Sequence, residues 1–589
     1  MREGSGTRGA GERIDDVDEP DFTPAATRLA ASVVLVRRGP DGLEVFWVRR
    51  GAQLKFAGGF YAFAGGRVDA ADGALPVSLR PGPGPANRAS SGTLGGPPSV
   101  NRGGALSLPA HHRGALSDDE RASIAAAARE LFEETGVLAV PGAERISRAE
   151  RDEARRGLTA RPGKSSETSA KSSETSLAGA GGKSAPRAGQ RDSQAGLFAA
   201  LLERHGLRVE ASWFHPAGRW ITPPSVPTRF DTRFYLLELP AGETAEVWPG
   251  ELADGEWITP ARALLRWDDG TALLHPPAWH TLKSLERGEL RDALFLLEDP
   301  ARAPWKLPIA DFIVERMEFQ RAIVMVPLRT PTLFPATHTN CMLLGDDKLL
   351  VVDPGSPWAP QQAILSTALQ RLEQDGRAAE AILLTHFHHD HVAGAMALSA
   401  EKGIPIWAHA DTAARLAGEV RVDKLLDDEA PLAYGPRGFR ALHLPGHTGG
   451  HLCLIEEKTG AVIAGDLVAG QSTVVIDPPE GDMRDYLASL DRLLALGPHA
   501  LYPAHGQVIA EGESLLRQYV AHRLDRESKV LRALEALGPA QPAALVPHAY
   551  AEVAPALHPL AERSLLAHLL KLVKDGAARQ REDGSFEIV

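Results

Sequence analysis

Imidazole and carboxylate side chains are concentrated in residues 385–391, whose sequence is THFHHDH. The apolar run AILL before this segment is typical of a buried strand, and VAGAMAL after it indicates the start of a helix. His386 and His388 are two positions apart where the chain leaves the strand, so both rings can point to one side. Asp390 and His391 follow the turn and can aim at a second point nearby. Because imidazole and carboxylate are the ligands that zinc-class ions prefer, the spacing predicts a metal site on this turn.

Four further segments place a histidine or an aspartate at the end of a strand-like run, next to glycine or proline. They are LLVVDPG with Asp353, LHLPGHTGGH with His447, AVIAGD ending at Asp466, and LYPAHG with His505. Five such segments, separated by helix-like stretches, indicate a two-metal site. We expect the remaining histidines of this region to be structural: His389, His409, His443 and His451.

A second concentration of acids lies earlier in the chain, in a predicted helix over 118–137. Ser117 is a candidate N-cap, and its spacing to Glu120 is that of a capping box. Glu130, Glu133 and Glu134 are three and four positions apart and therefore share one helix face, where like charges repel by a few tenths of a kcal/mol per pair. A divalent cation would remove this repulsion, and magnesium prefers carboxylate oxygens together with water and phosphate. Taken alone, the pattern also fits a solvated, charged helix face.

The composition restricts the class of protein. A chain of 589 residues suggests three or four units. The net charge of −12 argues against a general nucleic-acid-coating or membrane-surface protein, although a local basic patch remains open. Only two cysteines occur, Cys341 and Cys453, which excludes a disulfide framework. Together with the absence of a secretory signal and of a long apolar run, this predicts a cytoplasmic protein.

The order of the histidine and aspartate segments resembles the metallo-β-lactamase superfamily over residues 320–589. The resemblance is closest to the β-lactamase-like protein 2 group, because YPAHG runs into YVAHRLDRE and then a small C-terminal domain. It implies an αββα sandwich followed by a winged-helix-like domain, and two Zn²⁺ (or Mn or Fe) ions. By this resemblance the first ion is held by His386, His388 and His447, the second by Asp390, His391 and His505, and Asp466 bridges them. Asp353 would support the site from outside, and Asn340 matches another position near it.

The resemblance also implies a mechanism. Zinc lowers the pKa of bound water from 15.7 to about 7, which supplies a hydroxide at neutral pH. This nucleophile would attack a carbonyl carbon or a phosphorus, and Asp390 would orient it and shuttle its proton.

The segment 129–137, RELFEETGV, resembles the second half of the Nudix box. Gly65-Gly66 fits the start of the first half, whose glutamate position holds Asp72, and a long insertion separates the halves. The downstream segments WITP, RFDTRFYL and EWITPARAL are similar to the acyl-CoA diphosphatase branch of that family. This resemblance implies an α/β/α domain that binds Mg²⁺ (or Mn²⁺). By this resemblance Glu133 and Glu134 bind the metal, and Glu130 binds metal or helps to activate water. Arg129 would orient the carboxylates, Gly66 would offer its carbonyl oxygen, and Glu251 is a candidate extra ligand.

These segments predict a multidomain α+β protein. The short near-repeat KSSETSA–KSSETSL marks the second of two low-complexity insertions. We expect, in order, a disordered tail (1–24), a Nudix-like domain (25–270) with insertions near 74–112 and 141–193, a helical connector (271–318), a metallo-β-lactamase-like domain (319–525) and a winged-helix-like domain (526–589).

Three functions are compatible with this organisation. The first is a two-headed hydrolase, in which the C-terminal half cleaves an ester or thioester and the Nudix-like domain cleaves the diphosphate of a CoA or nucleotide derivative. In the second, the C-terminal half is a single-stranded RNA endonuclease and its winged-helix-like domain grips RNA rather than only packing against the catalytic domain. In the third, the Nudix-like domain is a sensor that binds CoA or a nucleotide without cleaving it. No membrane partner is expected.

Overall fold

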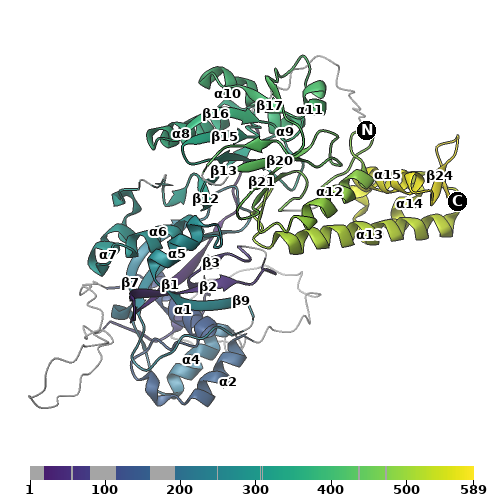
Figure 1. The fold of residues 1–589 in the computed structure, drawn as a ribbon. Helices are drawn as coiled ribbons and strands as arrows, with labels where there is room; N and C mark the ends of the chain where they lie inside the picture. Colours follow the sequence, from purple (N-terminus) through teal and green to yellow (C-terminus); the bar gives the residue numbers. More distant parts are fainter. Residues whose placement is uncertain are drawn as a thin grey trace, which may run out of the picture.

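The computed structural model describes residues 19–54, 57–79, 115–159, 193–248, 250–305, 307, 309–435, 438–470 and 474–589. The predicted tail up to residue 18, most of the insertion near 74–112 and residues 160–192 of the second insertion lie outside these ranges. In Figure 1 the chain forms an N-terminal unit below, a central unit above it, and a group of yellow-green helices at the C-terminal end.

The N-terminal unit is built on a nine-stranded sheet with the order β10-β11-β7-β8-β1-β2-β3, in which β4 pairs with β1 and β9 pairs with β2. Its strands are β1 (Thr27–Gly39), β2 (Gly42–Arg50), β3 (Tyr61–Ala62), β4 (Ala64–Arg67), β7 (His215–Ile221), β8 (Arg229–Glu238), β9 (Leu252–Ile258), β10 (Ile309–Ala310) and β11 (Ile313–Val314). Strand β1 is buried on both faces, since alternate side chains point to opposite sides of a sheet. Val33 and Leu35 enter one apolar core, and Val34 and Val36 enter the other.

Helices cover both faces of this sheet (Figure 1), which gives the expected α/β/α layers. One face carries α1 (Asp118–Thr135), α2 (Arg148–Thr159) and α4 (Gln194–Arg204), and the other carries α5 (Pro260–Asp268), α6 (Pro276–Leu285) and α7 (Leu290–Glu298). The short strands β5 (Val77–Ser78) and β6 (Val209–Glu210) pair with each other. The capping box of Ser117 and Glu120 at the start of α1 is confirmed, and the helix ends at Gly136 with a φ of 74°.

Two predicted segments differ from the structure in their content. The low-complexity segment 141–193 contains helix α2, because Arg155 and Leu158 are buried against the unit. The helical connector 271–318 is helical only in its first part, since β10 and β11 join the N-terminal sheet and β12 begins at Met317.

The central unit is a sandwich of two sheets. The first has the order β12-β13-β14-β15-β16-β17-β18 and the second has the order β19-β20-β21-β22-β23. Their strands are β12 (Met317–Gln320), β13 (Ile323–Arg329), β14 (His338–Leu344), β15 (Lys348–Val352), β16 (Ala378–Leu383), β17 (Ile406–Ala408), β18 (Lys424–Leu425), β19 (Pro431–Leu432), β20 (Phe439–His443), β21 (Leu452–Glu456), β22 (Val462–Gly465) and β23 (Leu501–Pro503). Helices α8 (Ala359–Gln374), α9 (His389–Val392), α10 (Ala395–Lys402) and α11 (Ala410–Arg415) belong to the first sheet, and α12 (Met483–Ala495) covers the second. The expected αββα sandwich is present.

The C-terminal unit contains α13 (Gly512–Leu537), α14 (Pro542–Ala549), α15 (His558–Lys574) and the hairpin of β24 (Ala578–Gln580) and β25 (Phe586–Ile588). Helix α13 runs through the predicted domain boundary at 525–526, so it belongs to both units. Among the described residues, no helix is long and apolar enough to cross a membrane.

The N-terminal unit packs against the central sandwich. Phe60 lies in the same apolar core as β12 to β14, with its ring stacked on His275 at 4.6 Å and edge-on to Phe319 at 5.3 Å. The backbone N–H of Leu274 donates to the carbonyl oxygen of Phe319 at 2.9 Å. The two units therefore share one continuous core.

Candidate metal centre

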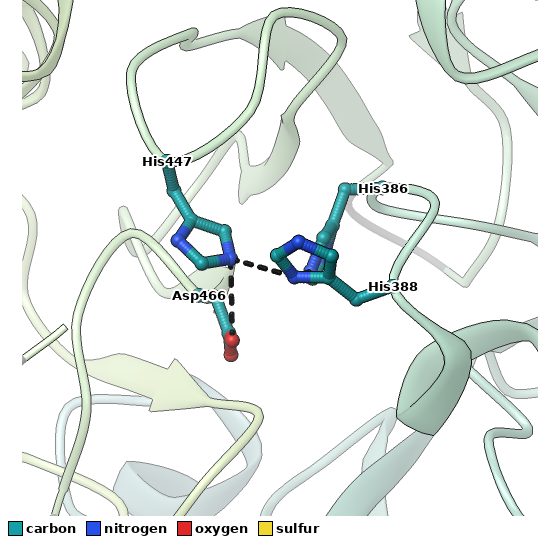
Figure 2. A group of neighbouring side chains, drawn as sticks. All are labelled: His386, His388, His447 and Asp466. Atoms are coloured by element: carbon teal, nitrogen blue, oxygen red, sulfur yellow. Dashed lines mark hydrogen bonds and ion pairs between the residues drawn. The ribbon is translucent and has the colours of Figure 1, made fainter. Parts of the chain in front are cut away.

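The first group of candidate ligands comes from three separate strand ends. His386 and His388 follow β16, His447 lies between β20 and β21, and Asp466 directly follows β22. Figure 2 shows the three rings facing one another beside Asp466. His388 Nδ1 lies 2.9 Å from His386 Nε2 and 3.0 Å from His447 Nε2, and His447 Nε2 lies 3.6 Å from Asp466 Oδ2. Four ligand atoms thus lie within 4.8 Å of one another.

The second group contains Asp390, His391 and His505, whose ligand atoms also lie within 4.8 Å of one another. His505 Nε2 lies 3.4 Å from both Asp390 Oδ2 and Asp466 Oδ1. His391 Nε2 lies 3.6 Å from Asp466 Oδ1. Asp466 therefore presents one carboxylate oxygen to each group. The structure brings together all seven side chains that the sequence placed at the two-metal site.

The chemistry of this donor set fits metal ions. His391 Nε2 is buried and has no hydrogen-bond partner among the described residues. A lone pair on this nitrogen could therefore bind a cation. Burial, and then the neighbouring imidazoles, lower the pKa of His388 to about 4, which keeps it neutral, as a metal ligand must be. Burial alone would also lower the pKa of His505, but Asp466 and Asp390 raise it to about 10. These carboxylates thus attract positive charge, which a divalent cation would supply in place of protons.

The outward-facing ring nitrogens are held by other groups, as is common around metal ligands. His391 Nδ1 lies 2.8 Å from Asp353 Oδ2, and Asp353 also accepts from the backbone N–H of Thr385 at 2.8 Å. This confirms the expected position of Asp353 behind the ligands. Asp353 has a φ of 53°, a conformation that is strained for a residue other than glycine. His447 Nδ1 lies 2.9 Å from the carbonyl oxygen of Val475.

Asn340 holds the turn that carries His505. Its side-chain amide donates to the carbonyl oxygens of Pro503 at 3.0 Å and Gly506 at 2.9 Å, and its backbone N–H donates to Ala504 at 2.7 Å. The turn that presents His505 is therefore fixed from both sides by one residue of β14.

His451 has a role that the sequence did not reveal. It is fully buried, and its Nε2 accepts a hydrogen bond of 3.0 Å from the backbone N–H of Asp466. Burial lowers its pKa well below the usual range, so the ring is neutral and can accept that bond. A Cβ added at Gly465 would lie 2.7 Å from the same nitrogen, so the chain approaches the ring closely here. His451 therefore positions Asp466. The one sequence signal for this role was its place directly before the apolar strand β21.

The other histidines lie outside the two groups. His409 and His443 form a third group with Asp411, but their rings are stacked at 4.0 Å with planes only 12° apart. Because nitrogens of parallel stacked rings point side by side rather than toward one point, this arrangement suits a structural contact. His389 belongs to none of the three groups found in the described part of the chain.

The acidic residues of α1 form a second polar cluster in the N-terminal unit. Arg129 donates to both carboxylate oxygens of Asp72 at 2.9 Å, and through Nη1 to Glu130 at 2.9 Å and Glu133 at 3.1 Å. The backbone N–H of Gly65 donates to Glu134 at 2.8 Å. The segments on the two sides of the long insertion therefore meet through side chains.

Gly66 belongs to the same cluster. A Cβ at this position would lie 2.3 Å from Glu130 Oε1, so the backbone of Gly66 lies directly against this carboxylate. Burial, and then the charge of Glu130, raise the pKa of Glu133 to about 8. The charge of Glu251 also contributes to raising the pKa values of Glu130 and Glu134, after burial and nearer charges. A cation would relieve this repulsion, although these carboxylates are not among the groups with all ligand atoms within 4.8 Å in the described chain.

Comparison with known proteins agrees with the two C-terminal units. The metallo-beta-lactamase superfamily profile matches residues 335–505, and that of the beta-lactamase associated winged helix domain matches residues 542–586. A crystal structure of a metallo-beta-lactamase family protein from Thermus thermophilus covers 46% of this chain and 99% of its own, with 24% identity and a TM-score of 0.37. A NUDIX hydrolase structure from Alicyclobacillus acidocaldarius covers 46% of this chain and 97% of its own, with 26% identity and a TM-score of 0.30.

Curated relatives give the identification. A beta-lactamase-like protein 2 homolog of Caenorhabditis elegans is 27% identical over 279 residues, 45% of this chain and 89% of that protein. An atrochrysone carboxyl ACP thioesterase of Cryptosporiopsis sp. (strain 8999) is 27% identical over 218 residues, 36% of this chain and 63% of that protein. The beta-lactamase-like protein 2 homolog of Drosophila melanogaster is 32% identical over 275 residues, 44% of this chain and 89% of that protein. The chain is therefore a hydrolase of the metallo-β-lactamase superfamily, with a winged-helix domain after its catalytic unit.

Proposed function

We propose that the central unit hydrolyses an ester or thioester at a centre for two zinc-class ions (zinc, manganese or iron). The observation that carries this proposal is the position of Asp466, which presents Oδ2 to His447 at 3.6 Å and Oδ1 to His391 at 3.6 Å and His505 at 3.4 Å. One carboxylate between two converging groups suits a pair of ions that share a ligand.

When bound, two such ions would lower the pKa of a water molecule and polarise the carbonyl of the substrate. The chain's own groups complete the reaction. Asp390, whose pKa lies below the usual range because the neighbouring His391 and His505 outweigh its burial, is an anion that can accept a proton from the attacking water. It can then deliver that proton to the departing alkoxide or thiolate. Asp353 and the Val475 carbonyl keep the rings of His391 and His447 oriented throughout.

The ester or thioester class is supported by relatives that are named atrochrysone carboxyl ACP thioesterases, from Cryptosporiopsis sp. and Claviceps purpurea. The alternative, cleavage of single-stranded RNA, needs a cationic surface to hold the phosphates. Among the described residues of the C-terminal unit, most arginine and lysine side chains are paired with carboxylates. These pairs are Arg526–Glu552, Lys529–Asp525, Arg563–Asp477, Lys571–Glu527, Lys574–Asp482, Arg579–Glu587 and Arg581–Glu587. This pairing favours the ester or thioester.

For the N-terminal unit we propose Mg²⁺- or Mn²⁺-dependent cleavage of the diphosphate in a CoA or nucleotide derivative, as in Nudix hydrolases. Asp72 supports this proposal. Its side chain is shorter than that of the glutamate expected at this position of the Nudix box, yet it makes a bidentate salt bridge to Arg129. Glu133, Glu134 and Glu130 would hold the cation with the Gly66 carbonyl, and Arg129 would orient Glu130 and Glu133. A non-catalytic sensor of CoA or nucleotides is the alternative outcome.

One panel of substrates tests both units. Acyl-CoA thioesters, CoA and nucleoside diphosphate derivatives, and labelled single-stranded RNA are incubated with wild type, Asp466→Ala and Glu133→Gln. Asp466→Ala should lose thioester hydrolysis only, and Glu133→Gln should lose magnesium-dependent diphosphate cleavage only. RNA cleavage that depends on Asp466, without thioester cleavage, would replace the first proposal. CoA binding by wild type without cleavage would establish the sensor.

A further inference from the structure

Two candidate cation ligands of the N-terminal unit lie at the end of a helix. Glu133 and Glu134 belong to the last turn of α1, which ends at Thr135. The C-terminal end of a helix carries a partial negative charge, and its last four carbonyl oxygens have no donor within the helix. Carboxylates are therefore unfavourable at this end, and a cationic donor there would offset both effects.

Arg155 of α2 supplies such a donor. Its Nε donates to the carbonyl oxygen of Glu133 at 2.8 Å, and its Nη2 donates to that of Glu134 at 2.6 Å. The other two carbonyl oxygens of the last turn accept from backbone N–H groups, in the pairs Gly136 to Phe132 at 2.9 Å and Glu246 to Thr135 at 2.8 Å. Every carbonyl oxygen at this end of α1 therefore has a donor.

Arg155 is fixed in its own place. Its side chain is buried, its Nη2 also donates to the carbonyl oxygen of Glu246 at 2.8 Å, and its guanidinium carbon lies 4.2 Å from the ring centre of Trp248. Burial lowers the pKa of Arg155 to about 10, so the group remains a cation at neutral pH. Helix ends commonly fray, but this turn is tied to α2 and to the segment between β8 and β9.

A second side chain acts on the carboxylate itself. Gln194, the first residue of α4, donates through Nε2 to Glu133 Oε2 at 3.2 Å and to the carbonyl oxygen of Leu158 in α2 at 2.9 Å. Arg129 donates to the other carboxylate oxygen, Oε1, at 3.1 Å. Each oxygen of an ionised carboxylate has two lone pairs, so Glu133 can keep both of these bonds and still bind a cation.

We infer that Arg155 and Gln194 are positioning residues of the cation site, and that α2, within the predicted low-complexity segment 141–193, is a part of this site. Arg155 fixes the backbone of the turn that carries Glu133 and Glu134. Gln194 fixes the orientation of the Glu133 carboxylate. A cation then meets ligands that are already in place, which raises its affinity. The inference rests on the Mg²⁺- or Mn²⁺-dependent site proposed above.

Binding of Mn²⁺ to the full-length protein, loaded with zinc and dialysed, tests this inference without turnover. Zinc fills the His/Asp centre, and Mn²⁺ does not displace it, because sites of nitrogen and oxygen ligands bind zinc more tightly. The paramagnetic resonance signal of free Mn²⁺ gives the affinity. Arg155→Met should lower this affinity by about tenfold, and Arg155→Lys, which keeps the charge, should recover part of the loss. Gln194→Leu, which removes one exposed hydrogen bond, should lower it by about threefold.

Hydrogen exchange of the α1 amides separates a loss of position from a loss of folding. Gln194 is exposed, so Gln194→Leu should leave this exchange unchanged while its Mn²⁺ affinity falls. Arg156→Met, at the exposed position next to Arg155 in α2, is the matched control and should bind Mn²⁺ as wild type does.

Wild-type Mn²⁺ affinity in both Arg155→Met and Gln194→Leu would overturn the inference, as would an equal loss in Arg156→Met. If Arg155→Met loses the protection of its α1 amides, Gln194→Leu decides alone, and wild-type affinity there overturns the inference. If wild type binds no Mn²⁺ beyond its zinc, the proposed cation site fails, and the inference fails with it.

Discussion

Arg129 and Asp72 form a bidentate salt bridge with two hydrogen bonds of 2.9 Å, although 57 positions separate them in the chain. Both side chains are buried, at 1% and 0% exposure. The bridge joins α1 to the segment that follows β4, and so brings Gly66 to Glu130. It explains how residues on the two sides of a long insertion can form one acidic site.

Removal of this bridge should destabilise the N-terminal unit. Asp72→Ala leaves the buried guanidinium without its bidentate partner, which should cost about 3–5 kcal/mol. Hydrogen exchange of the α1 amides measures the effect locally, which matters in a chain of several units. Asp72→Glu keeps the carboxylate and should lose less protection than Asp72→Ala. Wild-type protection of α1 in Asp72→Ala would show that the bridge does not hold the helix.

His451 should control metal affinity although it is not a ligand. In His451→Ala the backbone N–H of Asp466 loses its acceptor, and the shared carboxylate is no longer fixed. Loss of such an outer partner typically lowers metal affinity by about 10–100-fold, which chelator competition can measure. His451→Gln can offer an amide oxygen to the same N–H and should recover part of the affinity. If His451→Ala retains wild-type affinity, the histidine only fills space.

Arg523 should link the C-terminal unit to the metal centre. Its guanidinium donates to the carbonyl oxygen of Val474 at 2.5 Å, and the next carbonyl, of Val475, accepts from His447. Arg523→Met should loosen this loop and weaken metal binding by about tenfold, with the C-terminal helices still folded by circular dichroism. Arg517→Met, an exposed arginine of the same helix, is the matched control. Equal losses in the two variants would mean a general effect of charge on α13.

Stability should fall in mild acid because of two buried histidines. Burial lowers the pKa values of His275 and His280 to about 4, from the usual 6.5. As pH falls, the unfolded chain therefore takes up protons before the folded protein does. The free energy of unfolding keeps its full value above pH 6.5. Between pH 6.5 and pH 4 it falls by about 1.4 kcal/mol per pH unit for each of the two histidines.

Denaturant unfolding between pH 7 and pH 4.5 checks this dependence. The ring of His280 is neutral, since its Nδ1 accepts from Trp305 Nε1 at 3.0 Å. His280→Asn offers an amide oxygen to the same donor without a titrating group, and should show a shallower loss of stability in acid. The same slope in wild type and His280→Asn would contradict the assignment.

Features that depend on residues close together in the chain could be predicted from the sequence. The histidine and aspartate segments could be predicted as parts of one site because each follows an apolar strand, where a turn presents side chains at a fixed point. Which residue belongs to which ion was implied only by the family resemblance. Helix α1 could be predicted from the Ser117–Glu120 capping box. The role of His451 could not, because its partner is a backbone N–H fifteen positions away. The packing of Phe60 on Phe319 could not either, since no local pattern links residues on different units.

The metal content of the purified protein tests the central claim most directly. Wild type, loaded with zinc and dialysed, should retain about two ions per chain by mass spectrometry of the metal. Asp466→Ala should retain fewer than one, because its carboxylate contacts both ligand groups. Retention of two ions by Asp466→Ala, or of none by wild type, would contradict a two-metal centre organised around Asp466.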